Sequence, residues 1–345
     1  MRSNPTSTSR RPIDWRIRAA ATLIAGCALC GPSASVFAHD DDHDGDAKLW
    51  NTIRKARVID LSHTWTKQSP IASVNPPYSF SLAATHANKD AANPLGTRGN
   101  FGDGGQLSFT SEIMSWSGQH GAPSIDAIGH IGRDGKLFGG VDAAAATSNL
   151  GGLGVSGTGA HLAMDKFPND LLINRGVLLD VARWVRGDSS PLPATFEITA
   201  AHLKDAAQRQ RVRLRKGDTV FIRTGWGQYF DGDPASPPYA GGSSPGPGLD
   251  AAEYLIQAGA RVVGNDTLTF EQRPPIAFPP PTHQLQVFPV HMRLIADSGV
   301  FIIENLNLEE LSAARAYEFT VVTPPIKILG GTGSALRAFA LVPAR

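Results

Sequence analysis

Short apolar runs rich in β-branched residues recur along the chain and predict buried strands. They read RVIDLS at 57–62, GVLLDV at 176–181, TVFIR at 219–223, RVVG at 261–264 and VFIIE at 300–304. Two stretches between them have helical character: 199–210 begins with Thr199 and continues into an alanine-rich run, and 249–258 offers Asp250 as an N-cap. Strands alternating with helices predict an α/β protein.

Proline and glycine crowd residues 231–248 and 273–282. Both residue types favour turns and interrupt regular structure. We therefore expect surface loops there, which could form the lid of a pocket.

The amino terminus has the pattern of an export signal. A basic start is followed by the apolar run 19–30, and small residues before His39 suit cleavage after Ala38. We expect residues 1–38 to be a signal peptide, 39–55 a solvated polar tail and 56–345 the folded domain of a periplasmic protein. Lipid attachment at Cys27 is the alternative.

Composition excludes several other classes of protein. Cys27 and Cys30 are the only cysteines, so cleavage after Ala38 removes every thiol and with it cysteine nucleophiles, disulfides and thiolate metal sites. The 32 basic and 31 acidic side chains give a net charge of +1, which disfavours a nucleic-acid partner. After the signal, no apolar run approaches the ~20 residues of a membrane span.

Candidate chemistry is concentrated at 119–131, where His120, Ser124, Asp126 and His130 recur at even separations. In an extended strand, even separations place side chains on one face. Imidazole and carboxylate groups are suitable ligands for zinc, manganese or iron. The alternative is that these are ordinary polar residues around a glycine-rich turn.

Residues 126–130, DAIGH, resemble a motif of the cyclase family of metal-dependent hydrolases, which includes kynurenine formamidase. The family motif is His-x-Gly-Thr-His-x-Asp-x-Pro-x-His, with a variant that ends Asp-Ala-Leu-Gly-His. The resemblance implies that His120 and Asp126 are metal ligands and that His130 is a general acid or base. Ser124 falls on the second metal histidine of the family, and a hydroxyl is a weaker ligand than imidazole.

The resemblance continues downstream in FPVHMRLI at 288–295 and ENLNL at 304–308. It implies that His291 and Glu304 complete the metal site, with Glu304 also a candidate for handling protons. Further matching blocks are VIDLSH at 58–63, RGVLLD at 175–180, KGD at 216–218, RTGW at 223–226, GNDT at 264–267 and LGGTG at 329–333.

This resemblance implies a fold, a cofactor and a reaction. The expected fold is α/β, a swivelling β/β/α cyclase-like arrangement with a mixed, partly closed sheet and outer helices, in a homodimer or larger homo-oligomer. The expected cofactor is Zn or Mn. The expected reaction is hydrolysis by metal-activated water of a small amide, with N-formylkynurenine from tryptophan catabolism tested first, or of a cyclic amide or lactone.

Five residues are candidates for contacting an aromatic substrate, although scattered aromatic residues also fill protein cores. They are Asp60, His63, Trp116, Trp226 and His283.

Two other functions compete with metal-dependent hydrolysis. Residues 242–246 satisfy the serine-hydrolase pattern G-x-S-x-G, but Pro245 follows the serine and has no N–H to donate to an oxyanion. The other alternative is a non-enzymatic periplasmic binding protein whose metal site is weakened by Ser124.

Overall fold

The computed structural model describes residues 43–66, 68–70, 75–76, 78–84, 110–119, 121–147, 151–155, 157–230, 238–274 and 287–344. The chain divides into two compact units, Met1–Lys48 and Leu49–Arg345. The predicted signal peptide lies outside the described residues. Within the predicted polar tail at 39–55, helix α1 spans His43–Lys55, and its residues 47–55 are exposed. Its apolar residues Leu49, Trp50 and Ile53 recur at helical spacing.

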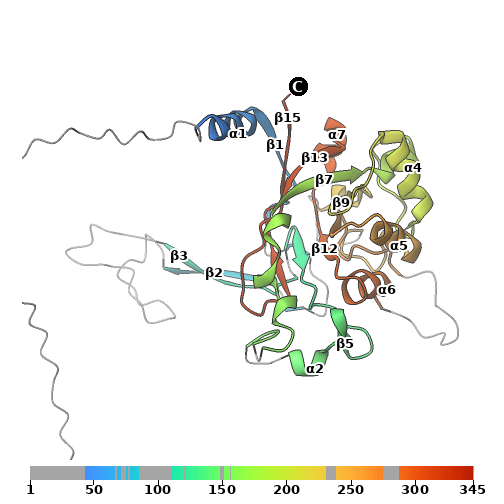
Figure 1. Ribbon diagram of the computed structural model, residues 1–345. Coiled ribbons are helices and arrows are strands. Elements are labelled where there is room, and N and C mark those ends of the chain that lie inside the picture. Colours follow the sequence, from blue (N-terminus) through green and yellow to red (C-terminus); the bar gives the residue numbers. More distant parts are fainter. Residues whose placement is uncertain are drawn as a thin grey trace, which may run out of the picture. The chain divides into compact units, whose positions relative to one another are not determined.

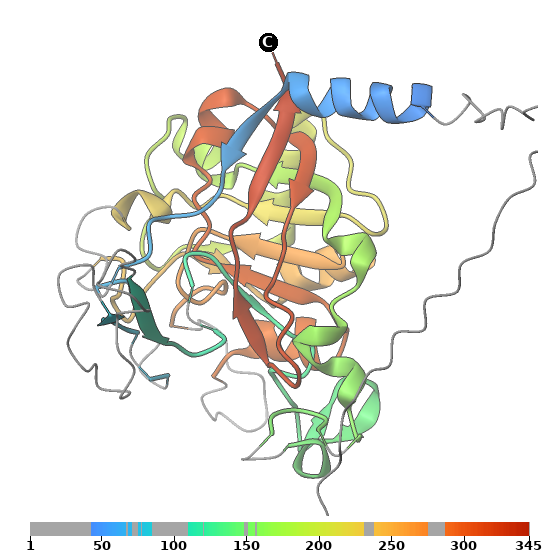
Figure 2. The same ribbon diagram turned by 90° about the vertical axis from the view of Figure 1, so that its left-hand side faces the viewer.

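One nine-stranded sheet organises the second unit and curls around itself (Figures 1 and 2). Its strands, in spatial order, are β1 (Ala56–Asp60), β15 (Phe339–Pro343), β13 (Glu318–Val322), β7 (Ile173–Leu179), β9 (Thr219–Ile222), β11 (Val262–Asn265), β12 (Phe301–Glu304), β4 (Ser124–Asp126) and β14 (Gly333–Ala335). The four strands β7, β9, β11 and β12 are parallel, and the remaining neighbours pair antiparallel.

Both faces of this sheet are buried at its parallel strands, whereas Val58 of β1 and Thr320 of β13 are exposed. Val177 and Leu179 of β7 enter the core beneath the helices, whereas Leu178 points into the core on the opposite face. The helices of the first core are α3 (Val181–Arg186), α4 (Ala200–Gln210), α5 (Leu249–Gln257) and α6 (Pro289–His291). Figure 1 shows α4, α5 and α6 on the same side of the sheet.

The other elements are short. They include the strand pairs β2 (Ser79–Ala84) with β3 (Ser111–Ser115), β5 (Lys136–Leu137) with β6 (Val141–Asp142), and β8 (Glu197–Ile198) with β10 (Gly246–Pro247), and the helices α2 (Ala143–Ala146) and α7 (Glu309–Ala314). Short 3-10 helices span Phe138–Gly140, Ala160–Leu162, Met164–Lys166, Asn169–Leu171 and Trp226–Tyr229. A π-helical turn, Met292–Ala296, continues α6. Within the described part of the chain, every helix is too short or too polar to cross a bilayer.

The α/β fold class is confirmed, and the five predicted strands overlap β1, β7, β9, β11 and β12. Helix α4 begins after Thr199, whose hydroxyl accepts from the backbone N–H of His202, as expected of an N-cap.

Two local predictions are wrong. The N-cap of α5 is Gly248, and Asp250 lies inside the first turn, where its carboxylate accepts from the N–H of Ala200. Residues 244–248 are buried rather than on the surface, because Gly246 and Pro247 pair with β8. Residues 231–237 and 275–282 of the two predicted loops lie outside the described residues.

A wholly buried arginine ties the end of β9 to two helices. The guanidinium of Arg223 is 3.0 Å from Asp180, the N-cap of α3, and 2.8 Å from Glu309 of α7. The carboxylates of Asp180 and Glu309 balance the charge of Arg223, because an unpaired charge in the protein interior would be strongly destabilising.

Candidate metal centre

Strands β4 and β12 place three polar side chains on one face of the sheet. Their antiparallel register sets Glu304 opposite Ser124 and Ile302 opposite Asp126. Alternation along β4 turns Ile125 to the opposite core, so Ser124 and Asp126 share the face that carries Glu304. The predicted site residues of two distant segments therefore meet through strand pairing.

His291 reaches this face from the end of α6. That helix follows Phe288, whose φ of 61° lies in the left-handed region, and the π-helical turn begins directly after His291. Turns of this kind are frequent at functional sites. The ring of Phe288 packs edge-on against the imidazole, with the ring centroids 5.0 Å apart.

One ligand atom from each of Asp126, His291 and Glu304 lies within 4.8 Å of the other two. The Nε2 atom of His291 is 3.2 Å from Oε1 of Glu304 and 3.8 Å from Oδ2 of Asp126. The three residues are 3%, 4% and 8% exposed for Asp126, His291 and Glu304. They line a cavity of about 80 Å³ together with Asn75, Gln119, His130, Ile131, Leu268, Thr269 and Phe288.

A third carboxylate, that of Glu271, contacts the opposite side of the His291 imidazole. Nδ1 of His291 lies 3.2 Å from Oε2 of Glu271, which is 1% exposed. An ionised carboxylate only accepts, so Nδ1 carries the hydrogen of this contact. The Nε2 atom then faces Asp126 and Glu304.

The carboxylates and burial shift two pKa values in this cluster. Burial by itself lowers the pKa of His291, but its hydrogen bonds to Glu271 and Glu304 outweigh burial and raise that pKa to about 10. Burial raises the pKa of Glu304 to about 7, against the opposing hydrogen bond from His291. The cluster therefore binds a positive charge strongly.

The donor set fits a divalent cation. With the hydrogen on Nδ1, a lone pair on Nε2 faces two carboxylates, and only a proton or a cation between these groups relieves their repulsion. One imidazole and two carboxylates are ligands of zinc, manganese and iron sites. In such sites the ligating histidine usually donates its other ring N–H to a carboxylate, as Nδ1 of His291 does to Glu271.

Ser124 lies beside the candidate ligands Asp126 and Glu304 on the same face of the sheet. It is 1% exposed, and its hydroxyl has no hydrogen-bond partner in the described part of the chain. Its position opposite Glu304 places that hydroxyl next to the cluster.

His130 stands at the edge of the cavity. Its Nε2 is 3.9 Å from Oδ1 of Asp126, and 28% of its side chain is exposed. It combines contact with the cluster and access to solvent, which a proton carrier needs.

The predicted strand carrying His120, Ser124, Asp126 and His130 is shorter than expected. Strand β4 holds only Ser124 and Asp126, and the chain then turns, with the N–H of His130 donating to the carbonyl of Ala127. This turn still returns His130 to Asp126. His120 lies outside the described residues.

Four candidate substrate-binding residues, Asp60, His63, Trp116 and Trp226, are not among the residues that line this cavity. Among the described residues, those lining the cavity do not include Asp60, which pairs with Arg337, or Trp116, which lines a separate cavity. His63 and Trp226 are buried near Phe230, with the rings of His63 and Phe230 stacked at 4.0 Å.

Placement of these residues follows from packing that the sequence does not display. Asp60 ends the outer strand β1, and the buried aromatic cluster of Trp226, Phe230 and Tyr239 supports Leu268, which lines the cavity wall. His283 lies outside the described residues.

Sequence reasoning missed Glu271 and Phe288. A carboxylate shortly after the buried run 261–264 was the available signal for Glu271, because polar residues at the carboxyl ends of parallel strands are often functional. Phe288 offered no comparable signal.

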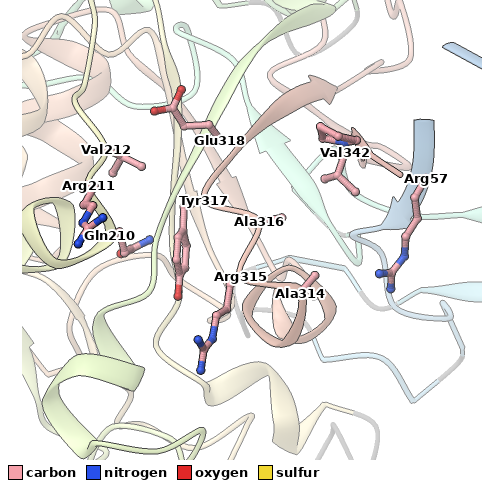
Figure 3. Close-up of a pocket in the computed structure, with 11 residues that line it drawn as sticks. Arg57, Gln210, Arg211, Val212, Ala314, Arg315, Ala316, Tyr317, Glu318 and Val342 are labelled. Carbon is pink, nitrogen blue, oxygen red and sulfur yellow. The ribbon is translucent and has the colours of Figure 1, made fainter. Parts of the chain in front are cut away.

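A larger cavity of about 410 Å³ lies away from the cluster (Figure 3). Arg57, Arg211 and Arg315 contribute to its lining. Its single carboxylate, Glu318, pairs with Arg175 at 2.9 Å. Among its described lining residues there is no set of metal ligands, so the smaller cavity is the candidate site.

A curled mixed sheet carrying a buried Asp–His–Glu set defines an α/β protein with a candidate metal centre. The family model described as putative cyclase matches residues 59–272, more than half of the 345 residues. The chain belongs to the cyclase family. The match includes Asp126, His130 and Glu271 and ends before His291 and Glu304, which the fold adds to the site.

An isatin hydrolase of Roseibium aggregatum is 31% identical over 150 residues, which cover 43% of this chain and 53% of that protein. The chain therefore aligns with about half the length of that relative. A crystal structure described as a novel cyclase is 26% identical, with a TM-score of 0.68 over 85% of this chain and 91% of the other. Isatin hydrolase A from Ralstonia solanacearum shares the fold at 20% identity, with a TM-score of 0.59 over 90% of this chain and 100% of the other.

Proposed function

We propose that this protein is a metal-dependent hydrolase of a small amide, with a cyclic aryl amide of the isatin type as the first substrate to test. The observation that carries the proposal is the convergence of Asp126, His291 and Glu304 beside His130. The isatin hydrolase relative supports a cyclic amide. An arylformamide such as N-formylkynurenine and a lactone are the next substrates, because both present a carbonyl to the same attack by water.

Asp126, His291 and Glu304 would hold the cation, with zinc and manganese as the metals to load. When bound, such a cation polarises a carbonyl group and acidifies water. Burial of the three ligands keeps bulk water from screening these interactions.

His130 would move the proton. Its position at the edge of the cavity would let the imidazole accept a proton from the attacking water and donate that proton to the leaving nitrogen as the C–N bond breaks. Water supplies the oxygen of the new carboxylate, and its protons are distributed between the two products. For a cyclic amide the products remain one molecule.

The test loads the mature protein with zinc or manganese and screens isatin, N-formylkynurenine and small lactones, with and without a chelator. We expect turnover that the chelator abolishes. His130→Ala is expected to lower kcat by about 10²- to 10⁴-fold while the bound metal stoichiometry stays unchanged. His161→Ala, outside the cavity lining, is the matched control.

Absence of stoichiometric metal and of turnover would favour the binding-protein alternative. Turnover that resists the chelator and yields to serine-directed reagents would favour the serine hydrolase. The buried Ser244, 5% exposed and bridged to Arg273, does not support that alternative. Export to the periplasm and a homo-oligomeric state stay predictions.

A further inference from the structure

Glu271 is a buried carboxylate with an unusual concentration of donors on one oxygen. Its Oε2 accepts from the backbone N–H of Val290 at 2.8 Å and of His291 at 3.0 Å, and lies 3.2 Å from Nδ1 of His291. Its other oxygen has no hydrogen-bond partner in the described part of the chain. Two of the three contacts of the Glu271 carboxylate are therefore with His291.

Glu271 holds both the backbone and the side chain of His291. The backbone N–H of His291 and its ring N–H meet at one oxygen, so the imidazole cannot turn without losing a charge-assisted hydrogen bond. The ring atom opposite, Nε2, is thereby aimed at Asp126 and Glu304.

The backbone that carries Glu271 is itself held in place. The carbonyl of Phe270 accepts from the side chain of Asn265 at 2.6 Å. Ser244 and Arg273 exchange two backbone hydrogen bonds, of 3.0 and 2.9 Å.

Gly246 packs against the same backbone. A Cβ added at Gly246 would lie 2.4 Å from the carbonyl oxygen of Phe270 and 2.5 Å from the carbonyl carbon of Glu271. The segment at 242–246 therefore supports the Glu271 backbone, and this close packing leaves room only for a glycine at position 246.

We propose that Glu271 is the positioning residue of the candidate metal centre, holding the His291 ring with Nδ1 as donor and Nε2 toward the cation, and that residues 244–246 keep Glu271 in place. This inference rests on the proposed function for its metal and on the observed hydrogen bonds for its geometry. Glu271 belongs neither to the set of three candidate ligands nor to the residues that line the cavity.

Two substitutions at Glu271 separate the effect of its charge from the effect of its size and acceptor oxygens. Glu271→Gln keeps an acceptor oxygen of the same size and removes the charge, whereas Glu271→Ala removes both. Calorimetric titration with Zn²⁺ and with Mn²⁺ is expected to show affinity falling by about 10-fold for the glutamine variant and by up to about 100-fold for the alanine variant. Glu253→Gln, which alters a surface pair with Arg293, is the control and should bind as wild type.

Hydrogen exchange on the metal-free protein tests the positioning independently. We expect the amides of Val290 and His291 to remain protected in wild type and in Glu271→Gln and to lose protection in Glu271→Ala. Equal protection in all three proteins would overturn the proposal. So would unchanged metal affinity in Glu271→Gln, since a purely structural support would survive that change.

The two proposals fail in different ways. Wild-type protein that binds no divalent metal refutes the proposed function, and the exchange measurement then still decides whether Glu271 holds His291. Should Glu271→Ala not fold, the affinity of Glu271→Gln decides.

Discussion

Replacing Asp126 by asparagine removes one of the two carboxylate ligands of the candidate metal centre while keeping the size of the side chain. Asp126 is 3% exposed and its Oδ2 lies 3.8 Å from Nε2 of His291, so the carboxylate contributes to the cluster directly. An amide oxygen carries no charge and binds a divalent cation less strongly. We therefore expect Asp126→Asn to weaken metal binding without opening a cavity.

The expected size of the effect follows from linkage. At a metal concentration about 100 times Kd, binding stabilises the folded protein by about 2.7 kcal/mol. Loss of a direct ligand should cost at least the ~100-fold in affinity that supporting residues can cost. At the same metal concentration the variant then gains only about 0.4 kcal/mol. At about 2.1 cal/mol/K of unfolding entropy per residue, a chain of this length shifts its Tm by roughly 1.5 °C per kcal/mol, so a wild-type Tm increase of roughly 4 °C falls to below about 1 °C.

Differential scanning calorimetry with and without zinc or manganese measures this change. The control is Asp205→Asn, which alters an exposed pair with Arg209 on α4 and should retain the full increase. An Asp126→Asn protein with the wild-type increase would show that the cation, if bound, lies elsewhere, and the assignment of the centre would be wrong.

Three further predictions concern pH, the buried arginine and Ser124. In the folded protein the pKa of His291 is about 10 and that of Glu304 about 7, both above the ordinary values of 6.5 and 4.5. Both groups therefore stabilise the metal-free protein at low pH and lose that contribution as the pH rises through about 7 for Glu304 and about 10 for His291. The Tm measured from pH 4 to 10 should fall over this window, and a rising Tm would contradict the assignment. Arg223→Met should cost about 3–5 kcal/mol of unfolding free energy in urea melts, because the buried carboxylate of Asp180 loses one of its two arginine partners and Glu309 loses its ion pair; a loss under about 1 kcal/mol would refute this. Ser124→His should tighten zinc affinity in calorimetric titration, because imidazole binds zinc better than a hydroxyl, and unchanged affinity would mean that residue 124 does not face the cation.

Local signals were sufficient for much of the fold. Thr199 caps its helix by accepting from the N–H of His202, and residues 219–222, TVFI, form a buried strand because three of them are β-branched and the fourth is aromatic. Such features depend on neighbours in sequence. The predicted site pairing of Asp126 with His291 and Glu304 came from family motifs, and the geometry of β4, β12 and α6 brings these residues together.

The features that sequence missed depend on distant partners. Gly246 and Pro247 form a strand only because Glu197 and Ile198 lie alongside. Glu271 acquires its importance from the N–H groups of a helix that begins 18 residues later. Neither partner is visible in a local pattern of apolar and polar residues.

The pairing of Ile302 with Asp126 joins positions 176 residues apart in the chain. Closing so long a loop is entropically costly, and contacts of this kind slow folding. Asp126 can therefore share a cation with His291 and Glu304 only after the central sheet has assembled. Uptake of the ion would thus report completion of the whole topology, and neither half of the polypeptide would capture it with this ligand set.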